Sequence, residues 1–229
     1  MFILEGNNGS GKSTLIKYLN QNLAGVLCKQ EPVEAWQKTG IGGSLLKEFY
    51  DNPKRWAYSM ESYTLLCRVR EQEGHKFGKV LVERSVFSGF YCFAKNGFQS
   101  GFMTKIEWEI YKKWFDFFAQ KFLQIPLGFV YLKSDPEICY KRVRKRSRAE
   151  EESMSLKYLK DLDALYDQLL LKKLDVIDQL KNVPILVLDG NLDFENNETI
   201  LKGFAQQIKE FIDLNYIASV QSKRAELSI

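Results

Sequence analysis

Five short runs along the chain are apolar at nearly every position, which distinguishes them from the mixed stretches between them. These runs are Phe2–Glu5, Val26–Gln30, Val80–Glu83, Leu127–Lys133 and Pro184–Asp189. Consecutive apolar side chains are typical of strands that are covered on both faces. The pattern therefore predicts five buried strands.

The stretches between these runs carry helical patterns. The predicted helices are Lys12–Leu23, Gly43–Phe49, Pro53–Glu73, Lys105–Phe122, Pro136–Arg146, Ser155–Leu180 and Glu198–Leu214. Alternating strands and helices predict an α/β fold, in which a doubly wound parallel sheet of five strands carries helices on both faces. Such sheets bind ligands beyond the carboxyl ends of their strands. We therefore expect Glu5–Gly6, Glu31 and Glu83–Arg84 to converge at that edge.

Length and composition restrict the class of protein. The 229 residues, of which 45% are hydrophobic and 27% charged, fit one globular domain spanning 1–229. No run of 18 or more apolar residues exists, so a transmembrane helix and a membrane partner are not expected. Because the first strand begins at Phe2, no room is left for a targeting peptide. These features predict a cytoplasmic location.

Cysteine and histidine usage excludes several kinds of site. The cysteines are widely spaced and form no Cys-x-x-Cys pair, which disfavours a zinc site, a redox motif and a disulfide framework. They are expected to be buried free thiols, and they are Cys28, Cys67, Cys92 and Cys139. His75 is the single histidine, which excludes multi-histidine metal sites. Ser-His-Asp catalysis would require His75 itself as the base.

The strongest chemical signal follows the first strand. Segment 6–13 reads Gly6-Asn7-Asn8-Gly9-Ser10-Gly11-Lys12-Ser13 and is followed by Thr14. It fits the G-x-x-x-x-G-K-[ST] pattern of a P-loop and has the required strand before it and helix after it. Backbone N–H groups of such a loop surround phosphate oxygens, while Lys12 reaches the β- and γ-phosphates and Ser13 ligates Mg²⁺. ATP with Mg²⁺ is the predicted ligand. A glycine-rich turn without function is disfavoured because all eight positions and both flanks agree.

Further charged residues at strand ends narrow the class. A GTPase would need an Asn-Lys-x-Asp segment, which is absent from the sequence. Glu31, held by the following proline, is placed to accept the proton of an attacking hydroxyl. Glu83 would hold Mg²⁺ through water, and Arg84 would neutralise charge on the phosphoryl group. The alternative for Glu31 is a solvated glutamate in a loop, without a catalytic role. The alternative for Glu83 and Arg84 is a simple ion pair at the surface.

The basic excess of the chain is local. Six positive residues lie within eight positions, and they are Lys141, Arg142, Arg144, Lys145, Arg146 and Arg148. Without these six charges the net charge falls from +4 to −2, which indicates one anion-binding element rather than a nucleic-acid surface. Arg142 and Arg146 are one helical turn apart and share a face. A nuclear-localisation or RNA-binding patch is the alternative, which the neighbouring Glu150–Glu152 disfavours.

Four segments together resemble the deoxyribonucleoside kinases, a family that includes deoxycytidine, deoxyguanosine and mitochondrial-type thymidine kinases. The segments GNNGSGKS, EPVEAW, VERSVFS and KRVRKRSRAEE occur in the family's order and at similar spacing. The resemblance runs from Phe2 to about Leu214, so the tail 216–229 lies beyond it. It implies a P-loop kinase fold with an arginine-rich lid at about 142–152. It also implies transfer of the ATP γ-phosphoryl group to the 5′-hydroxyl of a deoxyribonucleoside, in the salvage of DNA precursors.

The resemblance implies a role for each site residue. Tyr50 and Glu151 match residues that hold the sugar 3′-hydroxyl. Trp36, Phe49 and Phe93 match the walls around the nucleobase, although isolated aromatics of this kind are more often plain core. The catalytic matches are Glu31 as the base and Arg84 beside the 5′-hydroxyl, with Glu83 as the acid near Mg²⁺. The lid arginines match Arg142, Arg146 and Arg148.

Family members are typically homodimers, which the resemblance implies for this protein. The aromatic-rich Trp108–Phe118 segment is a candidate for that contact, although internal burial explains it equally well.

Two positions depart from the family pattern, so the resemblance leaves base preference open. Glu61 stands where the family has glutamine, and Gly89 replaces an aspartate that pairs with the retained Arg68. Glu61 and Arg68 lie two helical turns apart on one face, and their contact is one candidate replacement for the missing pair. An ionised Glu61 would favour deoxyguanosine, with Arg68 donating to the base. Alternatively, a protonated Glu61 would read cytosine, or a roomy pocket beside Gly89 would accept thymidine.

Two other functions remain in competition with this interpretation. Thymidylate and other nucleoside monophosphate kinases share the P-loop, but the EPVxxW pattern and the Glu-Arg-Ser triplet fit the nucleoside enzymes better. A non-catalytic nucleotide-binding module is disfavoured by the candidate base, the lid and the P-loop lysine.

Overall fold

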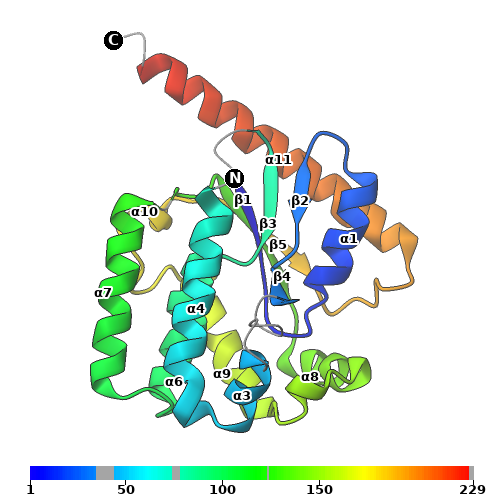
Figure 1. Ribbon diagram of the computed structural model, residues 1–229. Helices are drawn as coiled ribbons and strands as arrows, with labels where there is room; N and C mark the ends of the chain where they lie inside the picture. Colours follow the sequence, from blue (N-terminus) through cyan, green and yellow to red (C-terminus); the bar gives the residue numbers. More distant parts are fainter. Residues whose placement is uncertain (35–43, 74–77, 123, 227–229) are drawn as a thin grey trace.

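A five-stranded parallel sheet organises the chain (Figure 1). The computed structural model describes residues 1–34, 44–73, 78–122 and 124–226. The strands are β1 (Phe2–Glu5), β2 (Leu27–Lys29), β3 (Val80–Glu83), β4 (Gly128–Lys133) and β5 (Ile185–Asp189). Their order is β2-β3-β1-β4-β5, and each neighbouring pair is parallel. The predicted five-stranded parallel α/β sheet is confirmed, with strand ends shifted by one residue at β2, β4 and β5.

Alternation along β1 divides the core into two halves. Ile3 packs into one apolar cluster and Phe2 and Leu4 into another, because successive strand side chains point to opposite faces. On the Ile3 face lie α3 (Leu45–Asp51), α4 (Pro53–Glu73), α7 (Lys105–Lys121) and α9 (Leu156–Tyr166). On the other face lie α1 (Lys12–Asn22) and α11 (Glu198–Glu226). Figure 1 shows α4 and α7 on one side of the sheet and α1 on the other.

The predicted helix Ser155–Leu180 is wrong as one continuous element. The structure has α9, a π-helical turn at Asp167–Leu171 and the short α10 (Asp178–Lys181). Between the last two, Lys173 and Asp175 adopt positive φ angles of 51° and 55°, which no helix tolerates. The Lys173 ammonium donates to the carbonyl oxygens of Leu180 and Val183. This contact joins the turn to α10 and to the segment just before β5.

Sequence reasoning also missed the helical segment after β3. It comprises α5 (Val86–Ser88), a π-helical turn (Gly89–Ala94) and α6 (Lys95–Gln99). Two glycines weaken its helical signal, but Ser85 starts it with a capping box that it shares with Ser88. α8 (Pro136–Arg146) has the predicted bounds, and a 3₁₀ turn follows at Ala149–Glu151.

The last helix is longer than its sequence pattern predicts. α11 continues to Glu226 instead of ending at Leu214, so most of the tail 216–229 is helical. Leu214 and Ile217 are exposed there. Among the described helices, none combines the length and apolar character needed to cross a membrane.

Candidate active site

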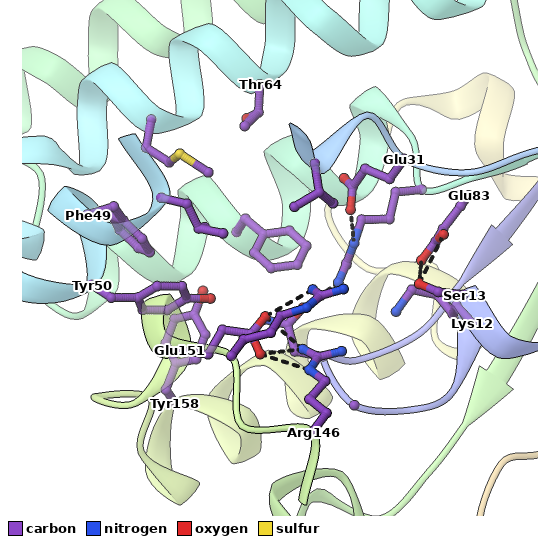
Figure 2. A pocket seen from close by; sticks show the side chains of 18 of the residues that line it. Lys12, Ser13, Glu31, Phe49, Tyr50, Thr64, Glu83, Arg146, Glu151 and Tyr158 are labelled. Atoms are coloured by element: carbon purple, nitrogen blue, oxygen red, sulfur yellow. Dashed lines mark hydrogen bonds and ion pairs between the residues drawn. The ribbon is translucent and has the colours of Figure 1, made fainter. Parts of the chain in front are cut away.

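One cavity lies beyond the carboxyl ends of β1, β2 and β3, where the sequence placed it. Of the expected site residues it is lined by Asn8, Gly9, Gly11, Lys12, Ser13, Thr14, Glu31, Phe49, Tyr50, Glu61, Arg68, Glu83, Arg84, Phe93, Arg146, Arg148 and Glu151. Figure 2 shows Lys12, Ser13 and Glu83 at one end and Phe49 and Tyr50 at the other. Trp36 lies outside the described residues.

The P-loop glycines are required by close packing as well as by backbone conformation. Gly9 and Gly11 have φ angles of 81° and 100°, in the region that favours glycine. A Cβ atom at Gly9 would lie 2.4 Å from the Cys139 carbonyl oxygen, and one at Gly11 would lie 2.4 Å from the Phe194 ring. The loop therefore fits tightly between α8 and the segment before α11.

Lys12 is buried inside the P-loop. Its ammonium donates to the carbonyl oxygens of Gly6 at 2.9 Å and Asn7 at 2.8 Å. Burial, followed by repulsion from Arg84, lowers the Lys12 pKa from its ordinary 10.5 to about 7. A phosphate group would supply the negative charge that this site leaves only partly balanced. Gly6, Asn7 and Ser10 do not line the cavity, and Asn7 instead donates to the Leu159 carbonyl oxygen.

Ser13 and Glu83 place oxygen atoms together beside Lys12. The Ser13 hydroxyl donates to Glu83 Oε1 at 3.1 Å (Figure 2). A hydroxyl and a carboxylate are hard oxygen donors of the kind that Mg²⁺ uses together with water and substrate phosphates. The two residues therefore fit the magnesium role expected for them.

Glu31 is held by two arginines. Glu31 Oε1 accepts from Arg68 Nη2 at 2.7 Å, and Glu31 Oε2 lies 2.9 Å from Arg84 Nε. The Glu31 side chain is only 8% exposed, so the alternative of a solvated loop glutamate is wrong. Both guanidinium groups orient this carboxylate within the cavity.

Arg84 connects Glu31 to the P-loop. Arg84 Nη1 donates to the Tyr166 hydroxyl at 2.6 Å, and Nη2 donates to Asn8 Oδ1. Its guanidinium also lies 4.6 Å from the centre of the Phe93 ring. Arg84 is 7% exposed, so the alternative of a surface pair with Glu83 is wrong. Tyr166, which no sequence motif singled out, is thus part of the support of this arginine.

The sugar and lid residues expected from the sequence contact one another. Glu151 is 5% exposed. Its carboxylate accepts hydrogen bonds from Arg146 Nε at 2.9 Å and from Arg148 Nη1 at 3.4 Å (Figure 2). Tyr50 packs against Phe49, with ring centroids 5.1 Å apart, and burial raises the Tyr50 pKa well above its ordinary value. These contacts bring the two predicted groups to one side of the cavity.

Arg142 lies in a second cavity on the other side of the P-loop. Its guanidinium donates to the carbonyl oxygens of Gly190 at 2.6 Å and Leu192 at 2.8 Å. Phe194, Lys141 and P-loop residues line this second cavity with it. Arg142 therefore joins α8 to the segment after β5, and Arg146 lines both this cavity and the first one.

Glu61 lies in the first cavity as a buried acid. It is 6% exposed, and burial raises the pKa of its carboxyl from 4.5 to about 7, although the positive charge of Arg68 opposes this rise. The cavity also contains residues that the sequence analysis missed, and they are Val33, Leu46, Met60, Thr64 and Tyr158. Met60 and Thr64 are close to Glu61 on α4, so their spacing along the helix could have predicted that they line the cavity. Nothing in the sequence around Tyr158 indicated that it would do so.

Gly89 leaves space that Arg68 occupies. A Cβ atom at Gly89 would lie only 2.6 Å from Arg68 Nη1. With no aspartate at this position, the guanidinium packs against the glycine while its Nε and Nη2 atoms donate to Glu31. Arg68 therefore binds the carboxylate of Glu31, the expected catalytic residue. Its positive charge also acts on the carboxyl of Glu61.

The buried acid gives a pH-dependent prediction for stability. Because the pKa of Glu61 is higher in the folded chain, its folded form binds more protons between pH 4.5 and about 7. The free energy of unfolding therefore falls as pH rises through this window, and the cost is complete above pH 7. Glu61→Gln removes the titration. We expect the stability of this variant relative to the wild type to be about 3 kcal/mol more favourable at pH 8 than near pH 4.5. Chemical denaturation at both pH values measures the difference, with the exposed Glu48→Gln as the control. An advantage that does not change with pH would contradict the prediction.

Comparison with known proteins now defines the class. The sequence profile of the deoxynucleoside kinase family matches residues 2–213. The protein belongs to the deoxynucleoside kinase family and is an ATP-dependent nucleoside kinase with the P-loop kinase fold. The resemblance found in the sequence motifs is confirmed.

Individual relatives cover almost the whole chain. The protein is 36% identical to deoxycytidine kinase 2 of Gallus gallus and 34% identical to deoxycytidine kinase of Homo sapiens, over 91% of this chain and 89% of each relative. It is 31% identical to the mitochondrial deoxyguanosine kinase of Xenopus laevis, over 91% of this chain and 88% of the relative.

Proposed function

We propose that the protein transfers the γ-phosphoryl group of ATP to the 5′-hydroxyl of a deoxyribonucleoside, as a salvage enzyme for DNA precursors. One observation carries this proposal. Arg84 binds the Glu31 carboxylate through Nε and the P-loop residue Asn8 through Nη2. A single side chain therefore fixes the candidate base relative to the loop that holds the donor phosphates. In-line transfer needs this fixed relation between acceptor and donor.

Each side chain then has a defined task. Glu31 accepts the proton of the 5′-hydroxyl as its oxygen attacks the γ-phosphorus. Lys12 and Arg84 stabilise the negative charge that spreads over the transferring group. Phe49 and Phe93 would enclose the nucleobase, and Tyr50 would contact the sugar.

Segment 142–152 acts in this proposal as the lid. In the structure, Arg146 and Arg148 both donate hydrogen bonds to the carboxylate of Glu151. When both substrates are present, the phosphates would draw these arginines away and the sugar 3′-hydroxyl would bind the released carboxylate. Guanidinium groups suit phosphate oxygens because they donate in pairs.

Magnesium would be held by Ser13 directly and by Glu83 through water. When bound, Mg²⁺ neutralises charge on the β- and γ-phosphates. The hydrogen bond from Ser13 to Glu83 supports this assignment, because it keeps both oxygens at the end of the cavity beside Lys12.

A substrate panel tests the function directly. The purified protein is incubated with ATP, Mg²⁺ and each of the four deoxynucleosides or the four deoxynucleoside monophosphates. Formation of monophosphates from nucleosides supports the proposal. Diphosphates formed from monophosphates alone would favour a nucleoside monophosphate kinase, and no product from any acceptor would favour a non-catalytic nucleotide-binding module.

A second copy of the chain is the proposed partner, through α7. Four large apolar side chains recur there at helical spacing and are exposed, namely Ile106, Ile110, Trp114 and Phe117. Such a face of one helix is too apolar for ordinary solvent contact. We expect light scattering to report a homodimer, and Trp114→Glu to convert it to monomer by placing a charge in the interface. Gln21→Glu on the exposed side of α1 adds the same charge elsewhere and should stay dimeric. A monomeric wild type would refute this interface.

A further inference from the structure

The nucleobase end of the cavity contains few hydrogen-bonding side chains. Its walls among the described residues include Leu46, Phe49, Met60 and Phe93. Thr64 Oγ1 donates to the backbone carbonyl of Glu61 at 3.0 Å, and its hydroxyl also acts on the Glu61 carboxyl, where it favours the charged form. The Glu61 carboxyl lines the cavity beside these apolar walls and is a polar group that can contact a base edge.

Arg68 is engaged by Glu31 rather than presented to the base. Two of its nitrogen atoms, Nε and Nη2, donate to Glu31 Oε1 at 3.2 and 2.7 Å. Its third nitrogen lies over Gly89. Arg68 therefore contributes a positive charge near Glu61, with Nε and Nη2 donating to Glu31. The part of the hydrogen-bonding pattern that changes with protonation comes from Glu61.

The surroundings of Glu61 set its charge. The charged and titratable groups that act on it, or on which it acts, come from six places around the cavity: Arg68 on α4, Glu31 after β2, Arg84 after β3, Tyr50 on α3, Tyr111 on α7 and Tyr158 on α9. Burial and Glu31 favour the neutral acid, whereas Arg68 and Arg84 favour the carboxylate. These opposing effects bring the pKa to about 7, so both forms are populated near neutral pH.

The two forms offer different patterns of hydrogen bonds. A neutral carboxyl has one O–H donor beside one acceptor, like a glutamine amide, and can match a donor–acceptor edge of any of the four bases, cytosine included. A carboxylate has acceptors only, and it matches the adjacent N1–H and amino donors of guanine. A good bidentate pair is worth about 1–3 kcal/mol of discrimination.

We propose that Glu61 selects the nucleobase by its protonation state, so that the neutral acid accepts deoxycytidine and the carboxylate favours deoxyguanosine. This inference rests on the proposed function and specifies its substrate. The enzyme thereby changes its preferred deoxynucleoside with pH, through one side chain and without a change of fold.

Competition between two substrates isolates this effect. Deoxycytidine and deoxyguanosine are supplied together with ATP and Mg²⁺, and the ratio of the two monophosphates is measured at about pH 6 and about pH 8. Groups that serve both nucleosides, such as Lys12 and Glu31, change both rates alike and cancel in the ratio. Across this range the ratio of ionised to neutral Glu61 changes about a hundredfold. We expect the ratio of deoxyguanosine monophosphate to deoxycytidine monophosphate to rise by about tenfold or more.

Glu61→Gln is the matched variant, because its amide keeps the shape and offers a donor and an acceptor at every pH. Its product ratio should stay constant between the two pH values and remain near the wild-type ratio at low pH. A wild-type ratio that does not change with pH overturns the inference whether or not the variant folds. An equal pH change in Glu61→Gln also overturns it. Neither result affects the proposed function, which fails only if the wild type phosphorylates no nucleoside.

Discussion

Replacing Lys12 with alanine is expected to lower kcat by about 10³-fold or more, because the proposed function gives this residue the task of stabilising charge on the donor phosphates. Among the described residues, its ammonium donates to the carbonyl oxygens of Gly6 and Asn7. Both contacts lie within the loop, so the variant should lose transition-state stabilisation and keep its sheet intact.

The variant should be at least as stable as the wild type. Burial lowers the pKa of Lys12 to about 7, which means that the folded chain disfavours the charged ammonium. Since the unfolded lysine keeps its proton up to about pH 10.5, the folded state bears the full cost of this burial at and below pH 7, and the cost fades as pH rises toward 10.5. Alanine removes this cost. Thermal unfolding without ligand should therefore occur at the wild-type temperature or slightly above it.

The control for this experiment lies on the same helix. Lys17→Ala removes an equal charge from the exposed face of α1 and should leave turnover unchanged. Normal turnover of Lys12→Ala, measured beside this control, would refute the assignment of the P-loop.

Local signals accounted for most of the fold. The P-loop, Glu31 and Glu83 each follow an apolar run directly, so identifying the strands also placed these residues at one edge of the sheet. The failures occurred where glycine or unusual backbone conformation interrupts a pattern. Gly89 obscured the helical segment after β3, and the positive φ angles at Lys173 and Asp175 ended a helix that the apolar spacing alone would continue.

Contacts between distant segments were beyond the reach of sequence patterns. Arg68 and Glu31 are 37 positions apart, and Tyr166 and Arg84 are 82 apart. Nothing in either local sequence specifies these pairs. The sequence did show that Gly89 departs from the family pattern, but the consequence required the structure. Arg68 fills the space beside Gly89 and binds Glu31, the candidate general base.

Glu31→Gln is expected to lower kcat by about 10²–10⁴-fold, the usual cost of losing a general base. Glutamine keeps the shape and one carbonyl acceptor, so Arg84 should remain fixed by Tyr166 and Asn8. The KM values for nucleoside and ATP should therefore change far less than kcat. Loss of a buried charge between two arginines should also lower the free energy of unfolding, which a thermal melt will measure separately.

A control variant at Glu34 helps to show whether Glu31 acts in catalysis or only in substrate binding. Glu34→Gln removes the same charge three residues further along, at an exposed position, and should retain wild-type turnover. Steady-state kinetics on both variants then distinguish two roles for Glu31. A fall in kcat at nearly constant KM identifies the proton acceptor, because the lost interaction exists only as the 5′-hydroxyl attacks. If instead KM for the nucleoside rises and kcat is preserved, Glu31 only positions the substrate through Arg68 and Arg84, and another group removes the proton.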